Sequence, residues 1–105
     1  MIIYEVNLAI QNNIFADYYA WLGDHVKAML ALPGFIQAEI LEEKKETHDR
    51  KTCLTVRYQL CDEIALQNYF ELHAKAKRAE ALERFGEDFS AHRRIFRVLA
   101  PPFNI

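Results

Sequence analysis

The stretch MIIYEVNLAI, residues 1–10, alternates between two kinds of side chain, and this alternation decides the fold class. One parity is wholly aliphatic or aromatic: Ile2, Tyr4, Val6, Leu8 and Ile10. The other parity includes the polar residues Glu5 and Asn7. Successive side chains of a strand point to opposite faces of a sheet. The stretch therefore predicts a strand with one face in the core and a second, mixed face.

The segment after this strand has helical spacing. Its apolar positions recur every three or four residues: Phe15, Tyr18, Leu22, Val26, Met29 and Leu30. This periodicity predicts an amphipathic helix over residues 14–32. Asn12 and Asn13 offer an N-cap at its start, and Pro33-Gly34 ends it.

Two further strands are predicted next, over residues 35–41 and 52–60, and the charged stretch 42–50 suits a hairpin turn between them. The third strand alternates as the first one does. Its apolar parity is Leu54, Val56, Tyr58 and Leu60.

The last third of the sequence predicts one long helix and one strand. Asp62 is a suitable N-cap for a helix that reaches residue 85, and Gly86 is a suitable stop. A strand over residues 89–99 follows. Pro101-Pro102 prevents further ladder pairing, so residues 100–105 form a short tail.

The resulting order is β-α-β-β-α-β, the split βαβ or ferredoxin-like arrangement, in one α+β domain over residues 1–105. Right-handed crossovers place both helices on one face of a four-stranded antiparallel sheet. The other face is left bare. We expect this face to pair with a second copy, which gives a homodimer with the two sheets facing each other.

The bare face is predicted from the parity opposite to the core. In the second strand it carries Phe35 and Leu41, which a monomer would leave in water. The first and third strands are central neighbours in this order, so Arg57 is expected near Glu5 or Asn7. Two interpretations stay open. The face simply pairs with its copy, or two facing sheets enclose a small pocket lined by Asn7, Glu39 and Arg57.

Composition narrows the function classes. The 105 residues carry a net charge of −2, without the basic excess of nucleic-acid-binding proteins, and no apolar run approaches a membrane span. Cys53 and Cys61 would lie roughly 26 Å apart on one strand, too far for a disulfide. Free thiols suit a reducing compartment, so we expect a cytoplasmic protein with no signal peptide.

The histidines show no metal-ligand spacing, and we expect no metal and no cofactor. On a helical wheel, His73 falls inside the apolar stripe of the predicted second helix, at an angle between those of Leu66 and Tyr69. Such a histidine is either a hydrogen-bonded core residue or a general base or haem ligand that reaches the pocket. His25, four residues after Trp21, is interpreted as a surface packing partner of that tryptophan.

A basic cluster begins the last strand: His92, Arg93, Arg94 and Arg97. It is interpreted as a solvated face or a partner of the acidic turn, with an anion site as the alternative.

The chain resembles, over nearly its full length, a bacterial family known as domain of unknown function 4286. The resemblance rests on MIIYEVN (residues 1–7), YFELHA (69–74) and ERFGEDFSA (83–91), which runs on into Arg93-Arg94. The family usually has a proline after His-Ala, where this chain has Lys75. The family implies no known reaction.

The layout and the LPGF turn at residues 32–35 are also similar to the wider dimeric α/β-barrel superfamily, which includes cofactor-free monooxygenases and haem-degrading enzymes. Its haem degraders use an Asn on the first strand and a Trp and a His on the second helix. Asn7 and His73 stand in comparable elements, whereas Trp21 is on the first helix.

Two functions follow from these sequence observations. The first is a small-ligand-binding or regulatory dimer without catalysis. The alternative is a cofactor-independent monooxygenase or haem-handling enzyme. The candidate ligand-binding residues are Asn7, Glu39, Arg57 and His73.

Overall fold

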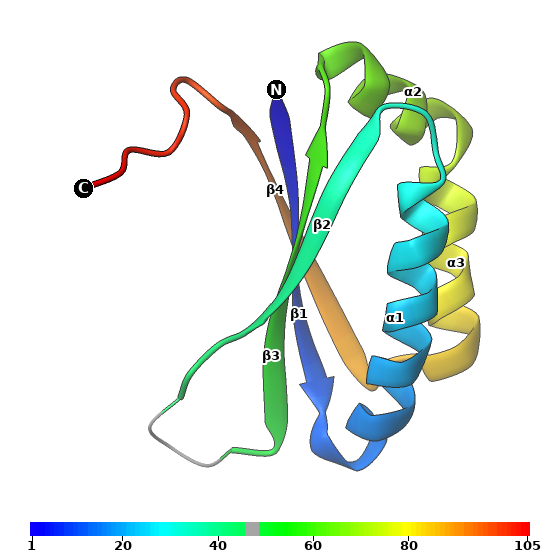
Figure 1. Ribbon diagram of the computed structural model, residues 1–105. Helices are drawn as coiled ribbons and strands as arrows, with labels where there is room; N and C mark the ends of the chain where they lie inside the picture. The colour runs from blue at the N-terminus through cyan, green and yellow to red at the C-terminus, as the bar shows by residue number, and fades with distance from the viewer. Residues whose placement is uncertain (46–48) are drawn as a thin grey trace.

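A four-stranded antiparallel sheet and the helices that cover one of its faces make up the two layers of the computed structural model (Figure 1). The structure describes residues 1–45 and 49–105. The elements are β1 (Ile2–Gln11), the 3-10 turn η1 (Asn12–Ile14), α1 (Phe15–Leu30), β2 (Phe35–Glu42), β3 (Lys51–Leu60), α2 (Glu63–Leu72), α3 (Ala74–Phe85) and β4 (Phe89–Arg97). The strand order is β2-β3-β1-β4, and the predicted ferredoxin-like class is confirmed.

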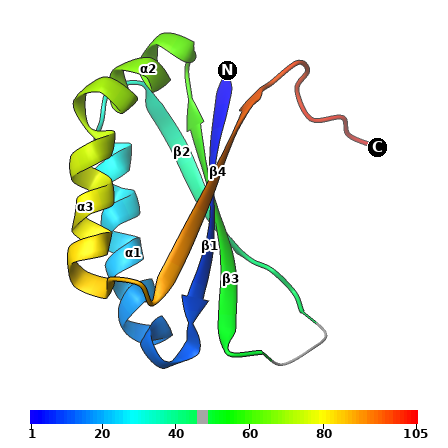
Figure 2. The same ribbon diagram turned by 180° about the vertical axis from the view of Figure 1, so that it is seen from behind.

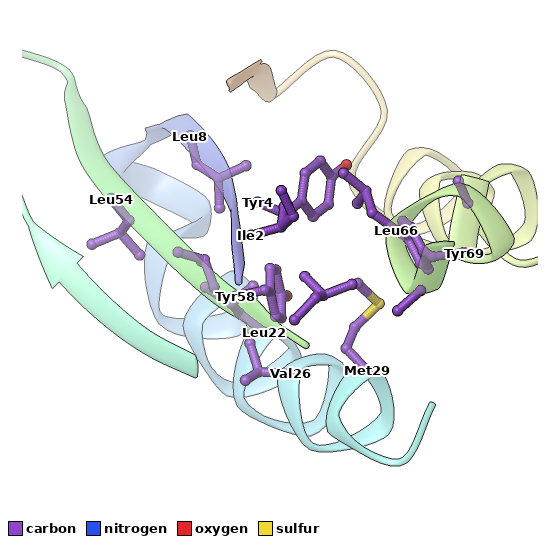
Figure 3. Packing of buried hydrophobic residues seen from close by; sticks show 14 of the residues in the cluster. Ile2, Tyr4, Leu8, Leu22, Val26, Met29, Leu54, Tyr58, Leu66 and Tyr69 are labelled. Atoms are coloured by element: carbon purple, nitrogen blue, oxygen red, sulfur yellow. The ribbon is translucent and has the colours of Figure 1, made fainter. Parts of the chain in front are cut away.

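The core lies between the sheet and the helices, and aromatic rings fill much of it. Tyr4 of β1 is paired with Tyr58 of β3, and their rings stack with centroids 6.0 Å apart. Tyr69 of α2 packs onto Tyr4 at 5.7 Å (Figure 3). Burying rings of this size provides much of the free energy of folding, and offset or tilted pairs add about 0.5–1.5 kcal/mol each.

A β-bulge in β2 overturns one prediction. Phe35 pairs with Leu60 while Gln37 pairs with Gln59, so β2 carries one extra residue at this point. The extra residue inverts the alternation. The Phe35 ring therefore packs edge-on against Tyr58 and Tyr69, at 5.7 Å and 5.5 Å, and lies in the core. The expectation that Phe35 lies on the bare face is wrong.

The predicted helix over residues 62–85 is two helices. His73, with φ −130°, leaves the helical conformation between α2 and α3. The break changes the direction of the chain, so that α3 runs beside α1 and buries Ala74 and Ala81 (Figures 1 and 2). Asp62 caps α2 as predicted, because its side chain accepts a hydrogen bond from the Ala65 N–H at 2.8 Å.

Asn12 does not cap α1. Its amide group instead ties the end of β1 to the β2–β3 connection, donating to the Asp49 carbonyl at 3.0 Å and accepting from the Thr52 hydroxyl at 2.7 Å. The N-cap prediction is therefore wrong. Residues 46–48 of the predicted hairpin turn lie outside the described residues.

The chain leaves the sheet after β4, where the Val98 N–H donates to the Met1 carbonyl at 3.0 Å. The tail that follows extends on the side of the sheet away from the helices, and its side chains Leu99 and Phe103 are about nine-tenths exposed (Figures 1 and 2). Among the described residues, no helix has both the length and the apolar character needed to cross a membrane.

Candidate functional site

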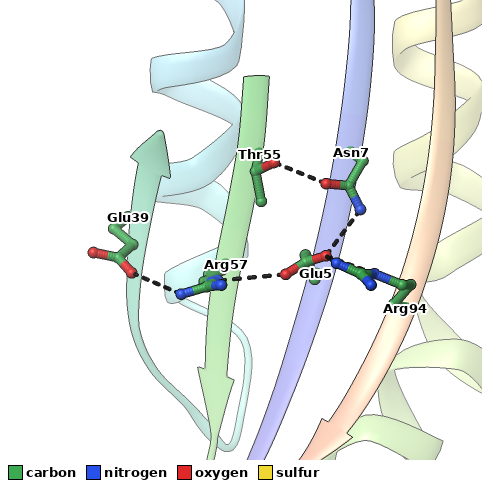
Figure 4. A network of polar contacts seen from close by, with 6 residues as sticks. All are labelled: Glu5, Asn7, Glu39, Thr55, Arg57 and Arg94. Carbon is green, nitrogen blue, oxygen red and sulfur yellow. Dashed lines mark hydrogen bonds and ion pairs between the residues drawn. The ribbon is translucent and has the colours of Figure 1, made fainter. Parts of the chain in front are cut away.

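The centre of the bare face is a polar network around Glu5, whose side chain is buried in the middle of the sheet (Figure 4). Arg94 of β4 donates to one carboxylate oxygen from Nη2 at 2.7 Å and from Nε at 2.9 Å. Arg57 of β3 donates from Nε to the other carboxylate oxygen at 3.4 Å. The side-chain amide of Asn7 donates to the oxygen that Arg94 contacts, at 3.0 Å. The predicted proximity of Arg57 to Glu5 is confirmed.

These contacts keep Glu5 ionised. The hydrogen bond from Asn7 lowers the pKa of the carboxyl most, burial raises it, and the bonds and charge of Arg94 and Arg57 lower it further. The outer members of the network are also partnered. Asn7 accepts from the Thr55 hydroxyl at 2.8 Å, and Arg57 lies 4.0 Å from Glu39.

The structure thus brings three of the four predicted site residues together on one face, namely Asn7, Glu39 and Arg57. His73 does not join them. It lies at the junction of α2 and α3, in the helical layer on the opposite side of the sheet. The four residues do not form one pocket within the chain.

A second candidate site lies between the helices and the sheet. It is a cavity of about 290 Å³ bordered by β1, β3 and β4 and by all three α-helices. Its walls are mainly aromatic and aliphatic, and they include Tyr18 and Trp21 of α1, Tyr58 of β3, Tyr69 of α2 and Phe89 of β4. Concave, mostly apolar pockets with a few polar groups are the usual form of small-molecule sites.

Two lining residues carry buried polar atoms that have no hydrogen-bond partner among the described residues: Nδ1 of His25 and Nε of Arg93. The His25 ring stacks on Trp21 with centroids 4.7 Å apart, and its Nδ1 stands 3.9 Å from the Glu80 carboxylate, beyond hydrogen-bond distance. A buried polar group without a partner costs about 1–3 kcal/mol. Both atoms belong to residues that line the cavity.

The protonation states suit a donor-rich site. Burial lowers the pKa of His25, the nearby Lys77 lowers it further, and Glu80 opposes both, so the imidazole is neutral at neutral pH. Burial raises the pKa of Tyr69 to about 12 and raises that of Tyr18 as well, and the charge of Arg93 acts against this effect at both. Both phenols therefore remain protonated and can donate hydrogen bonds.

The sequence did not predict that these residues come together around one cavity. The predicted pairing of His25 with Trp21 is confirmed, but the pair borders a cavity. The predicted basic cluster is divided by the strand, because alternate side chains point to opposite faces. Arg93 faces the helices and Arg94 the bare face. The shared parity of Phe89, Ala91 and Arg93 is the sequence signal that places an arginine on the core side.

No cluster of three or more potential metal ligands occurs in the described part of the chain.

Several solved structures share this fold. A dimeric ferredoxin-like protein from an uncultured marine organism is 13% identical over 99% of this chain and 100% of that chain, with a TM-score of 0.73. SnoaB, a cofactor-independent oxygenase from Streptomyces nogalater, is 14% identical over 95% of each chain, with a TM-score of 0.66. A variant of MhuD with two manganese protoporphyrin IX molecules bound per active site is 16% identical over 97% of this chain and 99% of that chain, with a TM-score of 0.67.

At these identities the likeness shows the fold alone. No match is found among curated protein sequences. A family model described as "Domain of unknown function (DUF4286)" matches residues 1–99, which is nearly the whole sequence. The chain therefore belongs to the DUF4286 family of domains of unknown function, and its fold is ferredoxin-like.

Proposed function

We propose that this chain is a small-ligand-binding protein that acts as a homodimer, with its ligand in the cavity between the helices and the sheet. The single observation that carries the proposal is that cavity, with the unpaired buried atoms of His25 and Arg93 on its lining residues. A ligand that supplies hydrogen-bond partners to these atoms removes the free-energy cost of leaving them unpaired.

The size of the cavity limits the ligand. An engineered cavity of roughly 150 Å³ takes up benzene, and the cavity here, about 290 Å³, is about twice as large. A molecule of one or two rings fits this volume. A porphyrin macrocycle is larger, so the cavity does not favour the haem-handling alternative.

The cavity is tested by filling it. Ala81 of α3 is buried and lines the cavity, and Ala81→Phe places a ring in the empty volume. Ala76→Phe, on the exposed side of the same helix, is the matched control. The sequence has one tryptophan, and Trp21 lines the cavity, so its indole N–H gives one resonance that reports on occupancy.

A panel of one- and two-ring phenols, alcohols and carboxylates is titrated against that resonance. We expect at least one compound to shift it in the original chain and in Ala76→Phe, with the response lost in Ala81→Phe. An equal response in Ala81→Phe, or no response to any compound, contradicts the proposal.

The homodimer is supported by the bare face. Although Phe35 lies in the core, Leu41 and Phe96 are each about 40% exposed there, and a solved structure with this fold is described as dimeric. The tail extends on this side of the sheet, away from the helices (Figures 1 and 2). The lining of a pocket between facing sheets by Asn7, Glu39 and Arg57 stays a prediction.

Sedimentation at micromolar concentration tests the dimer. The expected particle has twice the 12.3 kDa mass of one chain. Phe96→Asp, on the bare face, should shift the protein toward monomer, while Leu72→Asp, exposed at the end of α2, should not. A monomer for the original chain refutes the dimer but leaves the cavity proposal standing.

The free thiols Cys53 and Cys61 support a reducing compartment, and we place the protein in the cytoplasm on that ground.

A cofactor-independent oxygenase is the second candidate, and the neutral His25 is the observation that favours it. A buried neutral imidazole with a free nitrogen can take a proton from a bound acidic substrate. Consumption of oxygen in the presence of quinol substrates, lost in His25→Phe, is expected if the protein is such an enzyme. Oxygen consumption no greater than that of the His25→Phe protein would contradict the oxygenase, and ligand binding would then be the remaining function.

A further inference from the structure

We infer that the ligand of the helix–sheet cavity is a small aromatic monocarboxylate, whose carboxylate pairs with the Nε edge of Arg93. This inference rests on the proposed function and names its ligand class.

The charge of the lining is the first argument. Lys77, Arg78 and Arg93 line the cavity, and no aspartate or glutamate is among the lining residues in the described part of the chain. This contrasts with the sequence as a whole, in which 15 acidic residues outnumber 13 basic ones. A cavity with cations and without carboxylates favours an anion.

The other arginines of β4 supply the second argument. Arg94 donates from Nε and Nη2 to the carboxylate of Glu5, at 2.9 Å and 2.7 Å. Arg97 donates from the same two nitrogens to the carboxylate of Glu63, at 3.2 Å and 2.7 Å. In Arg93 the Nε is buried and has no partner within the described residues. The Nε edge of a guanidinium fits the two oxygens of a carboxylate, and Arg93 is the arginine of this strand whose carboxylate has to come from a ligand.

The neighbouring groups limit the ligand to one negative charge. Lys77 lies 3.9 Å from the Glu80 carboxylate, and Arg78 donates to the Tyr4 hydroxyl at 3.3 Å. Among the described residues that line the cavity, Arg93 is therefore the cation left for the ligand. The protonated phenols of Tyr18 and Tyr69, whose pKa values respond to the charge of Arg93, can add neutral donors, and these suit a monoanion better than a phosphate dianion.

The remaining walls select an aromatic body. Tyr18, Trp21 and Phe89 present rings to the cavity, and its volume of about 290 Å³ matches one or two rings. The carboxylate and the rings together define the class of benzoates and naphthoates.

The experiment compares 2-naphthoate with 2-naphthalenemethanol, a neutral molecule of nearly the same shape, by calorimetry and by the Trp21 indole resonance. Three proteins are used: the original chain, Arg93→Gln, and Arg97→Gln as a control on the same strand, where the arginine pairs with the exposed Glu63. We expect the original chain to bind the carboxylate at least about tenfold more tightly than the alcohol, because charge-assisted hydrogen bonds are the strong ones. Arg93→Gln should abolish this preference, and Arg97→Gln should retain it.

Equal affinity for the alcohol and the carboxylate, or an unchanged preference in Arg93→Gln, overturns the ligand class while the cavity proposal stands. Tighter binding of inorganic phosphate than of 2-naphthoate also overturns it. If neither naphthalene compound nor any member of the wider panel shifts the Trp21 resonance, both proposals fall. If Arg93→Gln does not fold, the ratio of the two affinities in the original chain decides the matter.

Discussion

Replacing Glu5 by glutamine tests the account of the bare face most directly. Glu5→Gln keeps the shape of the side chain and removes the charge that Arg94 and Arg57 contact. A hydrogen bond to a charged group contributes about 1.5–3 kcal/mol, and the half-exposed arginines reduce the value of each contact through solvent screening. Counting Arg94 as one strong contact and Arg57 as a weak one, we expect the free energy of unfolding to fall by about 2–3 kcal/mol. The thermal midpoint should then fall by about 10–20 °C.

The dependence on pH gives the prediction its sign. The pKa of folded Glu5 lies below its usual value of 4.5, so the folded state binds fewer protons than the unfolded state through this window. The stabilisation is fully present above the unfolded pKa and is lost as the pH falls from about 4.5 through the folded value. The difference between the original chain and Glu5→Gln should therefore be constant near neutrality and shrink in acid.

Urea unfolding at pH 7 and pH 3 measures both effects, at one protein concentration because self-association shifts apparent stability. Glu39→Gln is the control, since Glu39 is exposed and lies 4.0 Å from Arg57, and its cost should stay within about 0.5 kcal/mol. A cost for Glu5→Gln no larger than that of the control, or one that persists unchanged at pH 3, would show that the charge of Glu5 does not stabilise the fold.

Three further predictions concern single side chains. Burial lowers the pKa of folded His25, so the original chain should lose stability as the pH falls below about 6.5, and thermal midpoints of His25→Phe should depend less on pH in this range. Gly34→Ala should lower the free energy of unfolding in urea by more than about 1 kcal/mol, because Gly34 has φ +84° and the new Cβ meets Ala65. Gly23→Ala in helix α1, where the new Cβ has open space around it, should raise the free energy of unfolding by about 0.5–1 kcal/mol. Equal effects of the two substitutions would contradict this expectation. Asp62→Ala should cost about 1 kcal/mol through loss of the α2 cap, and Asp62→Asn, which can still accept the bond, should recover most of it.

Much of the fold could be predicted from local patterns. Parity in residues 1–10 and 52–60 identifies the core side of the two central strands, and the element order then makes them neighbours. These two inferences together place Arg57 beside Glu5, as the structure confirms. Asp62 and Gly86 mark the start of α2 and the end of α3 because capping is a local effect.

The errors arise where tertiary packing overrides a local pattern. The parity of Phe35 is inverted by a bulge, and the bulge depends on pairing with β3 rather than on residues 35–41 alone. The helix break at His73 occurs without a glycine or a proline, and after it α3 runs beside α1 (Figure 1). A helical-wheel argument that assumes one straight helix therefore misplaces His73.

The helix–sheet cavity could not be predicted, because it is a property of packing between elements far apart in the sequence. His25 and Arg93 lie on α1 and β4, and no spacing rule connects them. The part that could have been found is the alternation within β4, which assigns Arg93 to the core side and Arg94 to the bare face.

That alternation has a consequence for how this strand can change in evolution. Arg93 and Arg94 are consecutive in the sequence and serve opposite surfaces of the sheet (Figure 4 shows Arg94 on Glu5). Deleting or inserting one residue within β4 moves every side chain beyond that point to the other surface. A one-residue deletion before Arg93 would thus put Arg94 in the register position of Arg93 and Ile95 opposite Glu5, so that Glu5 would lose its arginine partner on β4. We expect related chains to vary in length at the turn between α3 and β4 and at the tail, and to keep β4 itself free of single-residue insertions.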